Sequence, residues 1–208
     1  MENKRTLVRT KEILSVATRL FVTQGYEATS MNQIREEAGI SKGLIYHYFK
    51  DKDELFDHVI ASLVQDALKK VEERSQWVTG FGPKMAIFID SWFELVFLNS
   101  KLVSSLNSCN RCSLFSQIKD FYMNYFANYC SALIEEGQQE GILTIEHPVQ
   151  MFDIAFTGCA FTTLDCICNE HCSTLQNLQL CVTAIERVLH LEENTILQHL
   201  AFDWHCNL

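Results

Sequence analysis

Apolar positions recur at three- and four-residue intervals along most of this chain, the spacing that one buried face of an α-helix requires. Within residues 7–24, Ile13, Ala17 and Leu20 follow this spacing and predict a first helix with one buried face. Gly25 follows directly and is expected to end that helix, because glycine accepts the left-handed conformation common at helix ends. The chain therefore opens with one amphipathic helix.

Three further helices are predicted before residue 76. Ser30 and Gln33 have the residue types of a capping box and predict the start of a short helix that Gly39 ends. Residues 41–49 predict a third, very short helix, and residues 51–75 a long fourth helix with one apolar face. Two short helices joined by a tight glycine-containing turn, behind a longer helix, are typical of a helix-turn-helix.

The third predicted helix carries an unusual group of rings. Ile45 and Phe49 lie four residues apart and are expected to face the core. Gly43 and His47 then point away from it. A surface helix with incidental aromatic residues would give the same pattern, but rings with polar tips beside lysines suit contacts with phosphates and base edges. The positions flanking this outer face are Leu44, Tyr46 and Lys50.

The stretch ILSVATRLFVTQGYEATSMNQIREEAGISKGLIYHYFKDKDELFDHVI, residues 13–60, resembles the TetR family of bacterial transcriptional regulators almost without gaps. The resemblance implies an all-α protein with an N-terminal three-helix helix-turn-helix DNA-binding domain, expected at residues 1–54. It also implies a larger C-terminal helical ligand-binding and dimerisation domain, expected at residues 55–208.

The same resemblance implies which residues contact DNA. Lys52, at the start of the fourth helix, would contact a phosphate. Two positions depart from the family pattern: Leu44 replaces a small or hydroxyl residue and could touch a thymine methyl group, and Arg35 replaces a small residue. A phosphate contact and a solvated charge are both open for Arg35, and we favour the second. The implied DNA contacts are Ser30, Met31, Asn32, Ser41, Lys42, Gly43, Leu44, Tyr46, His47, Tyr48 and Lys52.

Composition agrees with a helical protein in the cytoplasm. Hydrophobic residues make up 48% of the 208 residues, with only two prolines. No apolar run reaches the roughly 18 residues of a membrane span, and the N-terminus lacks an apolar signal segment. The net charge of −9 opposes loose binding to nucleic acid, yet residues 1–58 are balanced, with nine basic and nine acidic residues. DNA binding would therefore depend on a local basic face, to which Lys4, Arg5, Arg9 and Lys11 contribute an arm.

The C-terminal part begins after the break TGFGP and is rich in aromatic rings. Core packing explains most of them, and some are expected to line a site for an apolar or aromatic small-molecule effector. Asp90 and Glu94 share a helix face with Ser91 and Lys101, which favours a solvated polar stripe over counter-charges for a cationic ligand. The candidate ligand-site residues are Phe88, Trp92, Phe93, Phe121, Tyr122, Tyr125, Phe126 and Phe156.

The resemblance also implies a homodimer formed by the last two helices, expected at 148–169 and 173–205. The small residues Ala155, Gly158 and Ala160 would permit close packing with a second copy, and a buried contact within one chain explains them equally well.

The nine cysteines leave a different mechanism open. Cys109 and Cys112 have the spacing of half a zinc site, and three more cysteines gather near His171. The second group is Cys166, Cys168 and Cys172, whose spacing matches no strong metal signature, and free cysteine is common in cores.

We therefore expect no cofactor and no bound metal, and we keep a metal-sensing or thiol-redox regulator as an alternative. A DNA-bound adaptor for a protein partner, without a small-molecule site, is another. No motif of an enzyme occurs in the sequence, so no catalytic residues are proposed.

Overall fold

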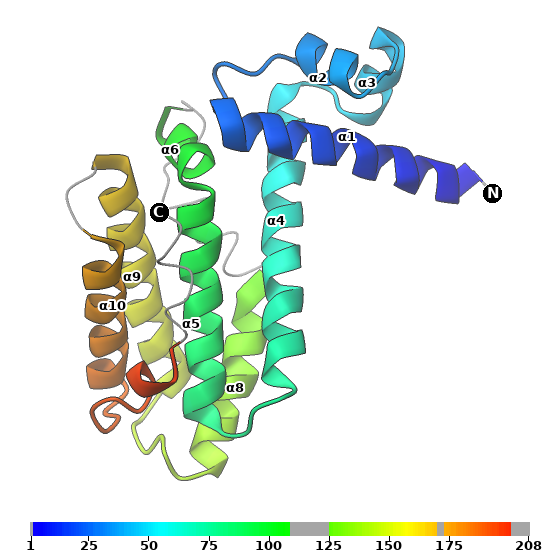
Figure 1. The fold of residues 1–208 in the computed structure, drawn as a ribbon. Coiled ribbons are helices and arrows are strands. Elements are labelled where there is room, and N and C mark those ends of the chain that lie inside the picture. Colours follow the sequence, from blue (N-terminus) through cyan, green and yellow to red (C-terminus); the bar gives the residue numbers. More distant parts are fainter. Residues whose placement is uncertain (1, 109–124, 170–172, 201–208) are drawn as a thin grey trace. The chain divides into compact units, whose positions relative to one another are not determined.

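The computed structural model describes residues 2–108, 125–169 and 173–200, and every regular element in these ranges is a helix (Figure 1). The expected all-α fold is thereby confirmed for this part of the chain. The elements are α1 (Glu2–Gln24), α2 (Met31–Glu37), α3 (Lys42–Tyr48), α4 (Lys52–Ser75), α5 (Phe81–Leu98), α6 (Ser100–Ser108), α8 (Ala127–Gln139), α9 (Pro148–Asn169), α10 (Thr174–Val188) and the 3₁₀ helix η2 (Leu197–His199).

The chain forms two compact units. Unit 1 comprises Met1–Leu63 and Asn99–Cys109, and unit 2 comprises Val64–Leu98 and Asn110–Leu208. The long helix α4 supplies its first half to unit 1 and its second half to unit 2. The expected domain division at residues 54 and 55 stays a prediction.

Unit 1 is built on the apolar face of α1. Ile13, Ala17 and Leu20 are buried, as predicted, and α2 and α6 pack against α1. Phe21 at the end of α1 meets the rings of Tyr26 and Phe56, with centroids 5.8 and 5.3 Å away. The helix begins at Glu2, earlier than the predicted residue 7, because no helix-breaking residue stands between them.

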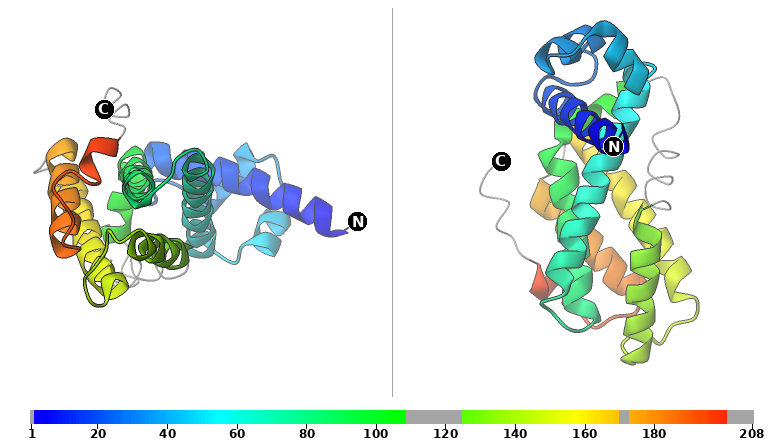
Figure 2. Two further views of the ribbon diagram at one scale, coloured as in Figure 1. Left: turned by 90° about the horizontal axis from the view of Figure 1, so that it is seen from below. Right: turned by 90° about the vertical axis from the view of Figure 1, so that its right-hand side faces the viewer.

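Unit 2 is a bundle in which α5, α8, α9 and α10 lie side by side (Figure 1 and the left view of Figure 2). Packed pairs are α9 with α10, α5 with α8, α8 with α9, and α10 with α5. Twelve of the 18 residues of α5 are buried, as expected for a helix that is apolar on nearly every face.

The last long helix is shorter than predicted. α10 ends at Val188, whereas the sequence predicted a helix to residue 205, of which residues 201–205 lie outside the described ranges. His190 adopts a left-handed conformation (φ 53°), and the N–H of Leu191 donates to the carbonyl of Glu186 at 2.8 Å. This is a Schellman ending with histidine in the position glycine usually takes.

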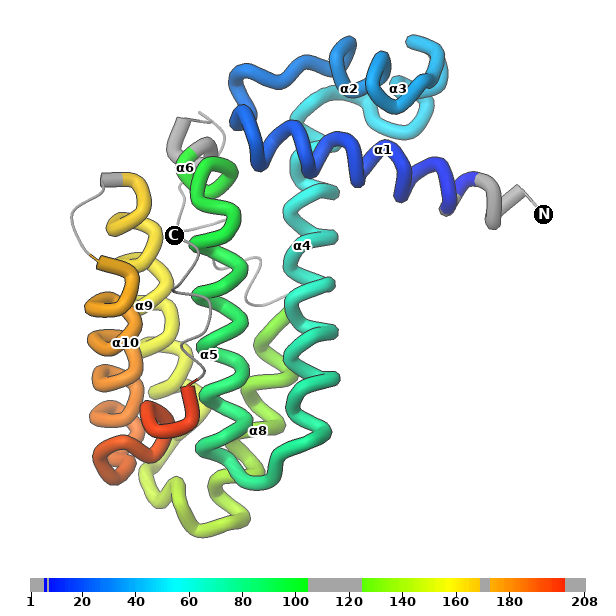
Figure 3. The backbone as a smooth tube through the Cα atoms, viewed as in Figure 1, coloured from blue at the N-terminus to red at the C-terminus, as the bar shows by residue number. Residues whose placement is uncertain are grey.

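The chain beyond α10 folds back against the bundle (Figure 3). The buried carboxylate of Glu186 accepts hydrogen bonds from the backbone N–H groups of Ile196 (2.7 Å), Leu197 (3.2 Å) and Asn194 (3.3 Å). η2 packs on α5 and α10. These hydrogen bonds fold the chain after Val188 back onto Glu186, so the helix ends there although the apolar periodicity continues.

The expected solvated stripe on α5 is wrong. Asp90 is 3% exposed and Ser91 5%. Arg74 of α4 lies over this face and pairs with Asp90 at 3.1 Å, and it also donates to Ser91 at 3.4 Å. The polar residues here hold α4 against α5 within unit 2.

One helix in the described ranges, α9, is long and apolar enough to cross a membrane by length and composition. A core helix of a soluble protein meets the same criteria, and α9 packs against both α8 and α10.

Candidate nucleic-acid interface

The short helices α2 and α3 are each fixed at both ends by local hydrogen bonds. The hydroxyl of Ser30 accepts from the N–H of Gln33 at 3.1 Å, and that of Ser41 accepts from Leu44 at 3.3 Å. Gly39 takes a left-handed conformation (φ 64°) after α2, and the following N–H of Ile40 donates back to the carbonyl of Arg35. The turn between the helices is therefore set by residues that the sequence pattern identified.

α3 buries one edge and exposes the opposite one. Ile45 is fully buried and Phe49 is 2% exposed, as predicted from their spacing. Tyr46 is 45% exposed, and a Cβ added to Gly43 would meet no atom within 4 Å. The outer side of α3 is thus an open surface with a ring that ends in a hydroxyl.

The structure exposes seven of the eleven predicted DNA contacts, whereas Leu44, Tyr48 and Lys52 are half-buried and Met31 is buried. Leu44 and Tyr48 are half-buried at the edge of α3. Met31 is 8% exposed, because its side chain fills the apolar face of α2. The exposed members are Ser30, Asn32, Ser41, Lys42, Gly43, Tyr46 and His47.

Lys52 has protein partners that the sequence did not indicate. Its ammonium group donates to the backbone carbonyls of Tyr26 and Thr29, both at 3.0 Å, and lies 3.9 Å from the centre of the Tyr26 ring. The hydroxyl of Tyr26 in turn donates to the carboxylate of Asp53. Lys52 therefore fastens the connection between α1 and α2 to the start of α4, and an ammonium group has one further proton to donate.

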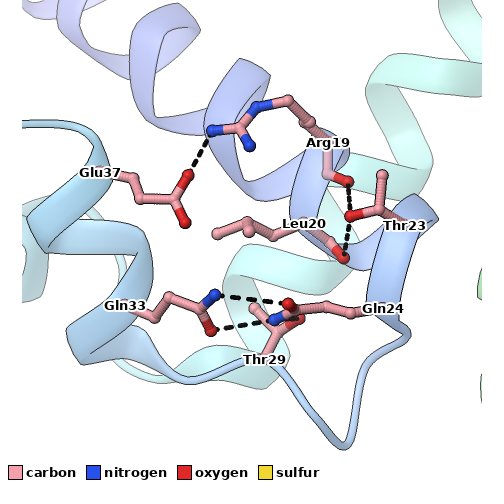
Figure 4. Close-up of polar contacts among 7 residues, drawn as sticks. All are labelled: Arg19, Leu20, Thr23, Gln24, Thr29, Gln33 and Glu37. Carbon is pink, nitrogen blue, oxygen red and sulfur yellow. Dashed lines mark hydrogen bonds and ion pairs between the residues drawn. The ribbon is translucent and has the colours of Figure 1, made fainter.

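A second set of polar contacts joins α1 to α2 (Figure 4). The side-chain amides of Gln24 and Gln33 bond to each other at 2.9 and 3.4 Å, and Gln24 also donates to Thr29 at 3.0 Å. Nearby, Arg19 forms an ion pair with Glu37. Sequence reasoning missed this network because its partners lie on two different helices, nine and 18 residues apart in the chain, so the periodicity of a single helix does not indicate them.

Arg35 is not the solvated charge that the sequence favoured. Its side chain is 27% exposed, and it pairs with Glu36 at 2.7 Å. Its Nε atom is buried and has no hydrogen-bond partner in the described part of the chain.

The predicted ligand-site rings only partly come together. Phe88, Trp92, Phe126 and Phe156 form one cluster, with ring centroids 5.2–6.2 Å apart. Phe93 is buried but stacks on Phe97 at 5.8 Å. Tyr125 is half-buried, and Phe121 and Tyr122 lie outside the described residues.

Two rings that the sequence did not select belong to the same cluster. Phe152 lies 6.3 Å from Phe88 and stacks on Phe156 at 5.6 Å. Tyr129 stacks on Phe88 at 6.0 Å, and its hydroxyl shares a hydrogen bond of 2.8 Å with Ser75. Burial raises the pKa of Tyr129, so it stays a neutral hydroxyl. Phe152 and Phe156 are four residues apart and therefore share one face of α9, so the sequence could have indicated Phe152 as a member of the cluster.

The cysteines fall into different environments. Cys166 is disulfide-bonded, whereas Cys130, Cys159, Cys168 and Cys181 are reduced thiols. Cys159 and Cys181 lie between α9 and α10, where each thiol donates to the backbone carbonyl of the other residue, at 3.6 and 3.8 Å. The interaction with Cys181, followed by burial, raises the pKa of Cys159. Within the described ranges no three histidine, cysteine or acidic residues converge as metal ligands. Cys109, Cys112, His171 and Cys172, the other parts of the considered zinc sites, lie outside those ranges.

Comparison with known proteins finds similarity chiefly in the N-terminal region. The sequence profile of the family described as bacterial regulatory proteins, tetR family, matches residues 13–59. The uncharacterized HTH-type transcriptional regulator YhgD of Bacillus subtilis is 42% identical over 65 residues, which cover 31% of this chain and 34% of YhgD. That match spans about a third of the relative. YxaF, another uncharacterized HTH-type regulator of the same species, is 28% identical over 138 residues, which cover 62% of this chain and 72% of YxaF.

The fold extends further than the sequence match. The crystal structure of the transcriptional regulator FadR from Bacillus subtilis, in complex with stearoyl-CoA, is similar with a TM-score of 0.66. It covers 86% of this chain and 97% of FadR at 18% identity, a level that shows a shared fold. All these relatives are described as regulators, in agreement with the expectation that this chain is not an enzyme.

Proposed function

We propose that this chain, whose residues 13–59 match the model of the tetR family of bacterial regulatory proteins, is a DNA-binding transcriptional regulator of that family. It binds a pseudo-palindromic operator as a homodimer in the cytoplasm, and an apolar or aromatic small molecule releases it. The observation that carries the proposal is the exposed edge of α3, where Lys42, Gly43, Tyr46 and His47 stand on a helix held from behind by buried Ile45.

α3 is suited to a major groove because it is short, open and held at a fixed angle. The open surface at Gly43 lets the backbone approach the duplex, and Tyr46 and His47 offer hydrogen-bonding rings to base edges. Ser30 and Ser41 cap α2 and α3, and the first-turn N–H groups of a helix are suited to contact a phosphate. From the start of α2, Met31 would contribute its backbone rather than its buried side chain.

Lys52 serves both the fold and the phosphate in this proposal. Two of its three protons go to the carbonyls of Tyr26 and Thr29, and the third goes to a DNA phosphate. The overall charge of −9 opposes non-specific binding, so such local contacts must supply the affinity.

Exposed apolar side chains on the last two long helices support the homodimer. Ile154 and Phe161 of α9 are 68% and 49% exposed, and Leu175 and Leu180 of α10 are 41% and 61% exposed. Ala155 and Ala160 are buried within the chain, whereas Gly158 is exposed with open space around it. Of the three small residues, Gly158 is therefore the one available for close packing with a second copy.

A dimer is also needed for specificity. One recognition helix reads only a few base pairs, and a two-fold dimer doubles the site, with the two helices entering major grooves about 34 Å apart. The test is sedimentation of the purified full-length protein with Phe161→Asp as the variant. The wild type is expected to be dimeric at micromolar concentration and Phe161→Asp monomeric with weakened operator binding. A wild-type protein that is monomeric at micromolar concentration and still binds operator specifically would overturn the proposed homodimer.

The effector is proposed to act through α4. This helix starts at Lys52, beside the proposed DNA contacts, and continues into unit 2, where Ser75 bonds to Tyr129 of the aromatic cluster. A ligand that separates the rings would tilt α4 and change the spacing of the two recognition helices. FadR of Bacillus subtilis, whose fold is similar, was crystallised with stearoyl-CoA, which supports an effector with a large apolar part.

Linkage gives a sharp test of release. If ligand weakens operator binding by a factor, operator must weaken ligand binding by the same factor, about 5- to 150-fold for ordinary coupling energies. Lipophilic compounds are titrated into the protein with and without its operator. Equal affinities for a compound that binds unit 2 would overturn the release mechanism.

A further inference from the structure

Trp92 of α5 has a hydrogen-bond donor without an acceptor in the described part of the chain. Its side chain is buried, and its indole Nε1 has no acceptor within the ranges that the structure describes. The indole N–H can only donate, and buried donors of folded proteins are paired in the great majority of cases. A phenylalanine would pack here without an unpaired donor, so the N–H is a feature that requires an explanation.

The surroundings of Trp92 are apolar and aromatic. The ring of Phe156 lies 5.3 Å away and that of Phe126 6.2 Å away, and Phe88 contacts both of these rings. A hydrogen bond in such a low-dielectric site is stronger than in water, and an unpaired donor is correspondingly costly. The cluster therefore offers a large apolar surface with one fixed donor.

The cations that pair with α5 and α8 favour a neutral acceptor over an anion on the ligand. Arg74 is paired with Asp90 at 3.1 Å. Lys84 is paired with Glu136 at 2.6 Å. Both cations are thus already neutralised by carboxylates, and a buried carboxylate on the ligand would gain no counter-charge from either.

We propose that the indole N–H of Trp92 is the donor that recognises a neutral carbonyl oxygen, as in a ketone or ester, on an apolar effector. The inference rests on the proposed binding of an effector to unit 2 and names the chemistry of that effector. Because the rings pack at 5.2–6.2 Å, the effector enters by separating Phe126 and Phe156 from Trp92. Recognition is thereby coupled to a shift of α8 and α9 against α5.

A pair of probes that differ only in the carbonyl tests this directly. Benzophenone and diphenylmethane have the same two rings, joined by C=O in the first and CH₂ in the second. Their affinities for the full-length protein are measured by calorimetry for the wild type, Trp92→Phe and the control Trp77→Phe, whose indole is 87% exposed. We expect the wild type and Trp77→Phe to prefer benzophenone by about tenfold, the upper range of one net hydrogen bond, and Trp92→Phe to bind both probes equally.

A second measurement covers the case in which Trp92→Phe does not fold. In the ¹⁵N-labelled wild type, the Trp92 indole N–H resonance, identified by elimination with Trp77→Phe and Trp204→Phe, should move downfield with benzophenone. It should not move downfield with diphenylmethane. Unchanged probe preference in a folded Trp92→Phe variant, an unmoved resonance, or no binding of either probe would each overturn the inference.

Failure of the carbonyl site and failure of the proposed regulator give different results. Trp92→Phe without ligand should bind operator like the wild type, because Trp92 lies in unit 2, away from the residues proposed to contact DNA in unit 1. A protein that selects no operator but discriminates the probes would refute the regulator and keep the carbonyl site. A protein that both probes release equally from operator would refute the carbonyl site and keep the proposed regulator.

Discussion

The polar contacts of the two units differ in where they lie and in what they hold. In unit 1 they are at or near the surface and fix short connections: Lys52 holds the backbone of Tyr26 and Thr29, and Gln24 bonds to Gln33. In unit 2 the decisive polar groups are buried, as with Asp90 and Glu186. Unit 1 thus presents a fixed outer surface, whereas unit 2 encloses rings and buried polar groups between helices.

This difference indicates a division of roles. A surface that reads DNA needs side chains that are exposed yet supported by a rigid backbone, and α3 meets that need in seven residues. A site that responds to a small molecule needs buried groups whose packing can change, which the aromatic cluster around Phe88 provides.

The largest expected effect is on the outer face of α3. Replacing Tyr46 and His47 together by alanine should lower operator affinity by at least about thirtyfold, since each base contact contributes about 1–3 kcal/mol. Both side chains are exposed, so the melting temperature and the dimer should not change. Fluorescence anisotropy with labelled operator measures the affinity. Wild-type affinity in the double variant would remove α3 from the interface.

The next effect tests the buried polar groups of unit 2. Glu186→Ala removes the acceptor for three backbone N–H groups, one of them on fully buried Ile196, and should lower the free energy of unfolding by about 2–3 kcal/mol. Glu186→Gln keeps an acceptor oxygen and should lose less. Urea denaturation measures both, with exposed Glu193→Ala as the control. Equal stability of Glu186→Ala and Glu193→Ala would show that Glu186 does not hold the turn after α10.

Lys52 should give a smaller effect with two separate signatures. Lys52→Ala should weaken binding to all DNA sequences about tenfold and reduce the slope of log affinity against log salt by about one. It should also destabilise the protein by about 1–2 kcal/mol, because two charge-assisted hydrogen bonds and a cation–π contact are lost. Lys69→Ala, at an exposed lysine of unit 2, is the control. A stability loss with an unchanged salt slope would leave Lys52 a purely structural residue.

The smallest effect concerns a thiol. Burial, followed by the nearby Asp165 carboxylate, raises the pKa of Cys168. A raised pKa means less thiolate at pH 8, so Cys168 should react with iodoacetamide more slowly than an unhindered cysteine peptide. Asp165→Asn should lower the pKa and modestly speed the reaction, as read by peptide mass spectrometry. No change with Asp165→Asn would exclude the carboxylate as a cause.

The sequence predicted unit 1 better than unit 2, and the reason is the range of the contacts. The α3 face follows from the four-residue spacing of Ile45 and Phe49, and the caps from serines next to the helices they start. The partners of Lys52 lie 23 and 26 residues away, so no local pattern indicates them.

In unit 2 the informative contacts are long-range as well. The rings could be identified by type, yet which of them meet depends on how α5, α8 and α9 pack. The burial of Asp90 could not be predicted because its partner Arg74 lies on a different helix. The end of α10 depends on Glu186 accepting from residues eight to eleven positions later, a contact that an apolar periodicity does not encode.

Selection of DNA from a random duplex pool by the full-length protein tests the central claim most directly, with the Tyr46→Ala/His47→Ala variant selected in parallel. We expect the wild type to enrich a pseudo-palindrome whose half-sites are centred about one helical turn, or a multiple of it, apart. The double variant should enrich no sequence. An enriched site without two-fold symmetry, no enrichment by the wild type, or the same site enriched by both proteins would contradict the account.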